Sequence, residues 1–119
     1  MRKVLYLSII AIVLVVSCNT GMEWPQASVN VKSTAQRDEG GARFLVVRYS
    51  LTNTCNSVIT RSTVSFSANT ATQSYYFTHV EEMRILPGNT IYVTAEQRLI
   101  AATETLTPNS LEIRDCFFE

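Results

Sequence analysis

Large apolar residues alternate with polar ones along most of the chain, a pattern typical of strands with one buried face. The clearest run lies within residues 42–53, where every second residue from 45 to 51 is large and apolar: Leu45, Val47, Tyr49 and Leu51. The same period of two predicts strands at 29–37, 42–53, 58–68, 74–78, 91–99 and 111–117. Residues 100–106 fit either a further strand or a loop, so the pattern predicts six to seven strands.

Turn residues separate these strands. Asp-Glu-Gly-Gly at 38–41 contains paired glycines, which supply the positive φ angles that a tight hairpin needs. In Leu-Pro-Gly-Asn at 86–89, proline fixes φ at the second turn position and glycine accepts a positive φ at the third. Thr-His-Val-Glu at 78–81 has the spacing of a capping box, which would open at most one or two turns of helix.

Short strands without a long helix predict an all-β fold. The number and spacing of the strands favour a single small antiparallel β-sandwich, about the size of an immunoglobulin-like domain. We expect this domain to occupy residues 28–119.

The amino-terminal segment departs from the alternation. Thirteen of its first 17 residues are apolar, and Arg2 and Lys3 precede the apolar run. The run from Val4 to Val16 is too short for a spanning helix, which needs about 20 residues, but it has the length of the apolar region of a secretory signal. We therefore predict a signal peptide at 1–17.

The end of this segment, Val15-Val16-Ser17-Cys18, resembles the bacterial lipobox, whose cysteine receives diacylglycerol and becomes the first residue of the mature chain. The resemblance implies that Cys18 is lipidated, that residues 18–27 form a lipidated tether, and that the protein is anchored in a membrane of the bacterial cell envelope. Two or three acyl chains, at about 0.8 kcal/mol per buried CH₂, make such an anchor effectively permanent. The alternatives are ordinary cleavage near Ser17, which gives a soluble secreted protein, and an uncleaved anchor.

The residue after the cysteine bears on which membrane holds the anchor. By the same resemblance, Asn19 replaces the Asp that retains lipoproteins in the inner membrane of enteric bacteria, which favours the outer membrane.

Three short motifs lie in the body of the chain: Val47-x-Tyr49-x-Leu51-x-Asn53, Val64-x-Phe66 and Leu86-Pro87-Gly88-x-Thr90. Together they resemble the small sandwich domains of bacterial lipoproteins, including the FxLYD-type family, in which a strand ending in Asn leads to a strand pair and then to an L-P-G turn. The F-x-L-Y-D string itself is absent. The resemblance implies a lipoprotein-type β-sandwich.

Charge and composition exclude several classes of function. The chain has ten basic and ten acidic side chains, and loss of Arg2 and Lys3 with the signal would leave eight against ten. The remaining cations are dispersed, so we expect no nucleic-acid binding driven by phosphate neutralisation. The only histidine is His79, which rules out a multi-histidine metal site. No glycine-rich phosphate loop is present, and we predict no metal and no cofactor.

Two cysteines remain once Cys18 is acylated. Cys55 and Cys116 form an even pair in a compartment that permits disulfides. A bridge between them would close a loop of about 60 residues, for which the loop-entropy model gives roughly 4 kcal/mol of stabilisation. We predict this disulfide, with two separate thiols as the alternative.

The sequence lacks a catalytic signature. His79 is a base without a G-x-S-x-G elbow or another motif that would place a nucleophile beside it. The carboxylate pairs at 38–39 and 81–82 are adjacent in sequence only, because neighbouring strand residues point to opposite faces. We therefore expect a protein that is not an enzyme.

The aromatic run Tyr75-Tyr76-Phe77 is the most notable local feature. Alternation sends Tyr75 and Phe77 to one face and Tyr76 to the other. Either these side chains pack in the core and under a covered sheet face, or they form a binding surface, where tyrosine is favoured. Phe117-Phe118 poses the same question.

These observations lead to two functional hypotheses. The first is a membrane-anchored envelope lipoprotein that binds or scaffolds another envelope protein or an exported ligand. The alternative is a small envelope inhibitor, such as a lysozyme-inhibitor lipoprotein.

Overall fold

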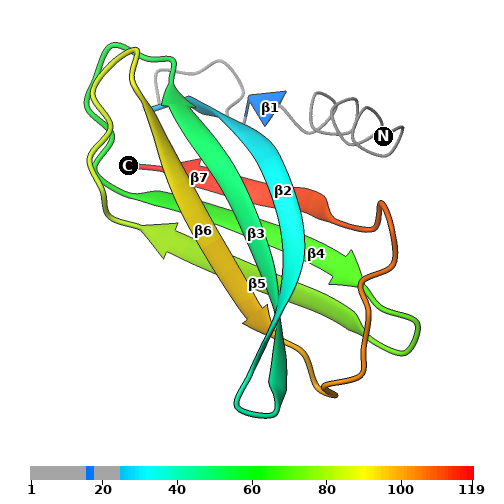
Figure 1. Ribbon diagram of the computed structural model, residues 1–119. Helices are drawn as coiled ribbons and strands as arrows, with labels where there is room; N and C mark the ends of the chain where they lie inside the picture. Colours follow the sequence, from blue (N-terminus) through cyan, green and yellow to red (C-terminus); the bar gives the residue numbers. More distant parts are fainter. Residues whose placement is uncertain (1–15, 18–24) are drawn as a thin grey trace, which may run out of the picture.

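The computed structural model describes residues 16–17 and 25–119, and Figure 1 shows that this part of the chain is built from strands alone. The signal peptide predicted at 1–17 and the tether predicted at 18–27 fall largely outside the described residues, as does Cys18. The strands are β1 (Val16–Ser17), β2 (Ala27–Glu39), β3 (Ala42–Asn53), β4 (Ser62–Asn69), β5 (Ser74–Glu81), β6 (Thr90–Arg98) and β7 (Glu112–Phe118).

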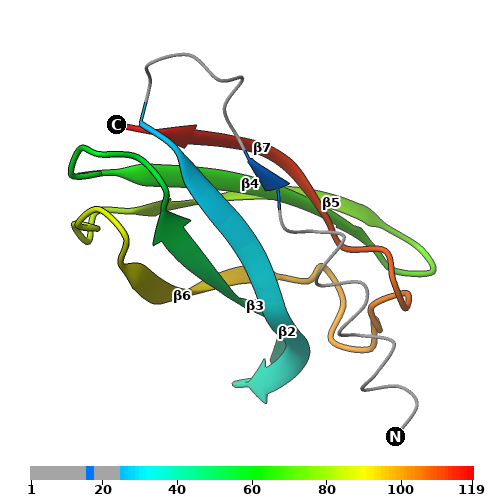
Figure 2. The same cartoon turned by 90° about the horizontal axis from the view of Figure 1, so that it is seen from above.

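The strands form two antiparallel sheets that lie face to face (Figure 2). The first sheet has the order β1-β2-β3-β6 and the second has the order β5-β4-β7. The all-β prediction and the predicted sandwich are therefore confirmed.

The longest structural unit is the hairpin of β2 and β3, which pair from Ala27 with Asn53 to Glu39 with Ala42. Its turn contains Gly40 and Gly41 at φ angles of 60° and 82°. Both values lie in the left-handed region that glycine adopts without a steric penalty, so the paired glycines close the hairpin as predicted.

The inward faces of the two sheets supply the core. Phe66, on the central strand of the second sheet, is fully buried and touches Tyr49 edge-on at 5.2 Å and Phe77 in a stacked arrangement at 5.5 Å, between ring centroids. Such aromatic pairs contribute about 0.5–1.5 kcal/mol beyond their buried area. The alternating residues of β3 that the pattern assigned to one face are all buried: Leu45, Val47, Tyr49 and Leu51.

Asn53 connects the end of β3 to the L-P-G turn. Its side chain is 1% exposed, and its amide nitrogen donates to the carbonyls of Ser57 and Ile85 at 2.8 Å each. Its backbone carbonyl accepts from Gly88, which has a φ of 81°. A buried amide whose hydrogen bonds are all made fixes the two loops at this end of the sandwich.

Two local predictions differ from the structure. Residues 58–61 precede β4: Ile59 forms an isolated bridge with Ile85, and the N–H groups of Thr60 and Arg61 donate to the carbonyl of Glu119. Residues 78–81 continue β5 as a strand, because Thr78 and Val80 pair with Ser65 and Thr63 of β4. Pairing with β4 therefore determines the structure of these residues, and the helical turn predicted from the capping-box spacing does not form.

Candidate functional site

The aromatic run on β5 contributes to both sides of the second sheet. Tyr75 and Phe77 are buried in the core, whereas Tyr76 is 64% exposed. The predicted alternation is confirmed, and of the three residues only Tyr76 is available to a partner at the surface.

Tyr76 belongs to a larger exposed area on the outer face of the β5-β4-β7 sheet. Val80 and Phe117 lie on either side of Thr63 in one row across the three strands, at 48% and 55% exposure. Ser67, which is paired with Tyr76, continues the same face. We call this surface the Tyr76 face; it comprises Tyr76, Thr78 and Val80 of β5, Thr63, Ser65 and Ser67 of β4, and Asp115 and Phe117 of β7.

Charged side chains lie mainly at the border of the Tyr76 face. Arg61 approaches Glu82 at 3.4 Å and Glu119 at 3.6 Å beyond the Val80 row, and Arg114 pairs with Glu112 at 2.8 Å on the outer strand. In the row between Tyr76 and Val80, the hydroxyls of Ser65 and Thr78 lie 2.8 Å apart, and Asp115 is paired with Ser65 on the edge strand β7. Exposed aromatic and aliphatic groups with charged side chains toward the edges have the composition of a protein-binding surface.

Phe118, beside Phe117 at the end of β7, is 2% exposed. The two terminal phenylalanines therefore divide between core and surface as Tyr75 and Tyr76 do.

A buried carboxylate, which the sequence did not single out, lies at the other end of the sandwich. Glu104 is 7% exposed in the loop between β6 and β7. Its carboxylate accepts hydrogen bonds from the Thr70 hydroxyl at 2.6 Å, from the Tyr75 hydroxyl at 2.8 Å and from the backbone N–H of Ala101 at 2.7 Å. The hydroxyl of Tyr75 also accepts from the N–H of Ile100 at 2.9 Å.

These contacts change the acidity of both groups. The hydrogen bond from Thr70, assisted by those from Ala101 and Tyr75, lowers the pKa of Glu104 below its ordinary value even though burial opposes the shift. Burial is the main cause that raises the pKa of Tyr75. Glu104 therefore remains an acceptor that ties the loop to β5.

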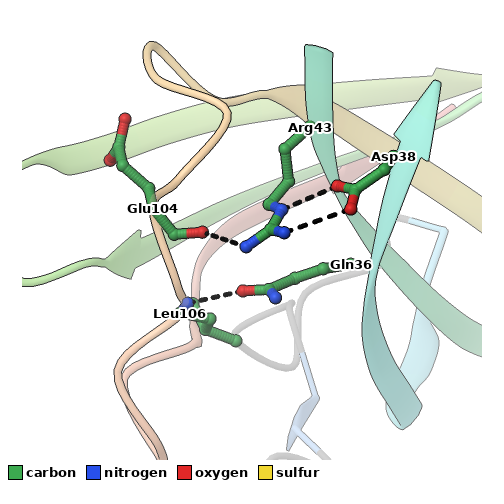
Figure 3. Close-up of polar contacts among 5 residues, drawn as sticks. All are labelled: Gln36, Asp38, Arg43, Glu104 and Leu106. Atoms are coloured by element: carbon green, nitrogen blue, oxygen red, sulfur yellow. Dashed lines mark hydrogen bonds and ion pairs between the residues drawn. The ribbon is translucent and has the colours of Figure 1, made fainter. Parts of the chain in front are cut away.

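The tip of the β2–β3 hairpin is fastened to the same loop (Figure 3). Arg43 donates to both carboxylate oxygens of Asp38 at 2.7 and 3.1 Å and to the backbone carbonyl of Glu104 at 2.9 Å. The side-chain carbonyl of Gln36 accepts from the N–H of Leu106 at 2.7 Å. Polar groups here hold the fold together and are not free for chemistry.

The predicted bridge between Cys55 and Cys116 is absent, because Cys55 is a free thiol. Its Sγ donates to the side-chain oxygen of Asn53 at 3.0 Å in the loop after β3. Cys116 lies within β7 and is paired with Val64 of β4, in the β5-β4-β7 sheet. The prediction was wrong because the thiol of Cys55 is hydrogen-bonded within its own loop, to Asn53 and to the carbonyl of Ser57 at 3.3 Å.

The candidate catalytic groups are engaged in side-chain contacts. His79 Nε2 lies 3.2 Å from the carboxylate of Glu81, while Asp38 is paired with Arg43 and Glu39 lies 3.5 Å from Arg37. Within residues 16–17 and 25–119, no group of three or more His, Cys, Asp or Glu side chains is arranged to hold a metal ion. The same part of the chain has no helix of the length and apolar character needed to cross a membrane.

Sequence reasoning missed some exposed groups as well as Glu104. Tyr92, on β6, is 72% exposed. Its alternation with the buried Val93 could have placed it on the outer face of the first sheet, together with Arg48 of β3. The capping-box spacing predicts a helical turn at Val80, and this prediction hides its place on a sheet face, where it is paired with Thr63.

Comparison with known proteins supports the fold. No protein-family model and no curated protein sequence matches the chain, so the resemblance to FxLYD-type domains gains no support there. Among solved structures, the Salmonella enterica trimeric lipoprotein SadB is similar with a TM-score of 0.50 at 13% identity, over 87% of this chain and 58% of that one. A DUF1425 family member from Shewanella sp. pv-4 has a TM-score of 0.45 at 16% identity, over 83% of this chain and 86% of that one. The chain thus spans somewhat more than half of the SadB structure, and what the two share is the β-sandwich fold.

Proposed function

We propose that the protein is a lipoprotein of the bacterial cell envelope, anchored through Cys18 and favouring the outer membrane, whose sandwich binds another envelope protein or an exported ligand. The signal-like segment and the lipobox-like residues before Cys18 support the anchor. SadB, which shares the sandwich fold, is itself described as a lipoprotein, and this is compatible with the proposal.

The Tyr76 face is the observation that carries the binding role. Tyr76, Val80 and Phe117 are each about half exposed or more, although large apolar side chains in strands usually pack against a second layer. Burying such residues against a partner stabilises the complex, at about 25 cal/mol per Å² of apolar surface removed from water. Tyrosine and phenylalanine are also enriched where proteins bind one another.

The same proposal makes the protein a binding module without enzymatic activity. His79 faces Glu81, and the buried Glu104 is saturated with donors from Thr70, Tyr75 and Ala101. These groups are used to stabilise strands and loops, which supports a structural role for them.

Site-specific photocrosslinking in cells tests the binding role. A benzophenone amino acid replaces Tyr76 or Phe117 in the full-length lipidated protein, and the matched control position is Thr94, which is exposed on the opposite sheet. We expect one discrete product of the same mass from positions 76 and 117, and none from position 94. Absence of a product from both positions, or equal products from all three, would contradict binding through the Tyr76 face.

A further inference from the structure

We propose that the outer face of the β2-β3-β6 sheet lies against the anionic lipid surface of the membrane that holds the anchor, with the Tyr76 face turned away from it. This inference rests on the proposed lipid anchor and adds an orientation to it. We call this surface the basic face and define it by Lys32, Arg48, Tyr92 and Arg98.

Charge is distributed unequally between the two sheets. Strands β2, β3 and β6 contain five basic residues against three acidic ones: Lys32, Arg37, Arg43, Arg48 and Arg98 against Asp38, Glu39 and Glu96. Strands β4, β5 and β7 contain one basic residue against three acidic ones: Arg114 against Glu81, Glu112 and Asp115. An anionic surface therefore attracts the first sheet and repels the second.

The acidic residues of the first sheet are already neutralised by only two of its cations. Arg37 makes two hydrogen bonds of 3.0 Å to Glu96 and lies 3.5 Å from Glu39. Arg43 holds Asp38. Among the described residues, Lys32, Arg48 and Arg98 have no acidic partner within salt-bridge distance, so these three charges remain for an external anion.

The three cations lie on the outer side of the sheet. Arg48 is exposed between the buried Val47 and Tyr49, and it faces Thr94 on β6 and Ser33 on β2. The register shift between Val31 and Ser33 leaves Lys32 as the extra residue of a β-bulge opposite Arg48. Arg98, farther along β6, is paired with Phe44.

Tyr92 completes a surface suited to lipid head groups. It is 72% exposed. Arg48 is paired with Thr94, two residues farther along β6, so Tyr92 and Arg48 are diagonal neighbours on the same face, which lie about 7–8 Å apart. Tyrosine is favoured at the membrane–water interface because its ring is apolar and its hydroxyl is polar. Basic side chains beside it would reach lipid phosphates.

The position of the anchor brings this face within reach of the lipid. Nine residues, 18–26, separate the proposed lipidated cysteine from the start of β2 at Ala27. Even fully extended, nine residues span only about 30 Å. The first sheet is therefore tethered at one of its own strands, close to the membrane.

Energy transfer to a dansyl-labelled lipid head group measures the orientation. The full protein is reconstituted through its own anchor into vesicles of phosphatidylglycerol and phosphatidylcholine. The variants Tyr92→Trp and Tyr76→Trp add a donor to opposite faces, and the single natural tryptophan of the wild-type protein supplies the background. We expect greater transfer from position 92 than from position 76, and we expect the difference to vanish in phosphatidylcholine alone or at high salt.

Removing the basic charges tests whether electrostatic attraction causes the proposed orientation. Each basic side chain at an anionic lipid surface favours binding about fivefold, so Arg48→Gln with Arg98→Gln is expected to lower the population of the proposed orientation about thirtyfold. The control is Arg61→Gln, just before β4, with Arg114→Gln on β7; their side chains are 49% and 53% exposed, and the double change should leave the transfer from position 92 unchanged.

The outcomes separate this inference from the proposed anchor. Protein that floats with the vesicles but shows equal transfer from positions 92 and 76 overturns the orientation alone. Transfer from position 92 that resists both high salt and loss of the two arginines overturns its electrostatic cause. Protein that does not float with the vesicles overturns the lipid anchor, and the orientation fails with it.

Discussion

Replacing Tyr75 with Phe removes a single hydroxyl and tests whether the Glu104 contacts stabilise the sandwich. Tyr75 is 9% exposed, and its hydroxyl lies 2.8 Å from both carboxylate oxygens of Glu104. A hydrogen bond to a charged acceptor contributes about 1.5–3 kcal/mol. The N–H of Ile100 also loses its acceptor, but Ile100 is 73% exposed and water can replace the hydroxyl. We therefore expect Tyr75→Phe to lower the free energy of unfolding by about 2 kcal/mol.

Urea denaturation near neutral pH measures this loss. With a slope of about 1–2 kcal/mol/M for a domain of this size, the midpoint should fall by about 1–2 M. The matched control is Tyr76→Phe, because Tyr76 is the next residue and its side chain is mostly exposed. A surface change of this kind shifts stability by less than about 0.5 kcal/mol. Equal midpoints for the two variants would refute the stabilising role of the Glu104 contacts.

The pH dependence provides a second test of the same contacts. The folded state holds the pKa of Glu104 below its ordinary value of 4.5, chiefly through Thr70. The stabilisation is therefore complete above pH 4.5, and it is lost as the pH falls from 4.5 through the folded pKa, because the unfolded chain binds the proton first. Tyr75→Phe removes one of the hydrogen bonds that lower this pKa. The difference between the urea midpoints of the wild type and the variant should therefore become smaller in acid. A difference that widens would contradict the assignment.

Three further predictions concern the core, the hairpin and the thiol. Phe66→Ala should lower the free energy of unfolding by about 3–5 kcal/mol in urea denaturation, because its fully buried ring leaves a cavity; a loss under 1 kcal/mol would argue against the described core. Arg43→Met should speed hydrogen exchange at the backbone N–H of Leu106 while leaving Phe66 protected, and unchanged exchange would mean that Arg43 does not fasten the hairpin tip. Alkylation of the native protein followed by peptide mapping should find label on Cys55, whereas a peptide in which Cys55 is linked to Cys116 would contradict the free thiol.

The backbone arrangement was largely predictable because strand periodicity is a local signal. The alternation around Leu45 correctly predicts the strand β3, and the paired glycines at 40–41 correctly predict the turn between β2 and β3. The end of β5 was less predictable. Thr78 and Glu81 have capping-box spacing, and only pairing with β4 shows that they belong to a strand.

The candidate surfaces were only partly predictable because they depend on residues brought together from distant positions. Alternation alone placed Tyr76 opposite Tyr75, but the row of Val80, Thr63 and Phe117 requires the strand order β5-β4-β7. Glu104 lies in an irregular loop whose apolar residues do not alternate regularly with polar ones. Its partners Thr70 and Tyr75 are 34 and 29 residues away in the sequence.

The predicted disulfide shows what a cysteine count leaves open. The sequence placed Cys55 in a turn and Cys116 in the last strand, and both placements are correct. An even count does not say which thiols meet, and Cys55 is a free thiol.

The intact mass of the protein extracted from membranes tests the proposed lipoprotein most directly. The account predicts a chain that begins at Cys18 and carries the added mass of a diacylglycerol and its acyl chains, and it predicts that Cys18→Ala abolishes this form. A chain that begins elsewhere without added lipid mass, or that retains Met1, would contradict the lipid anchor.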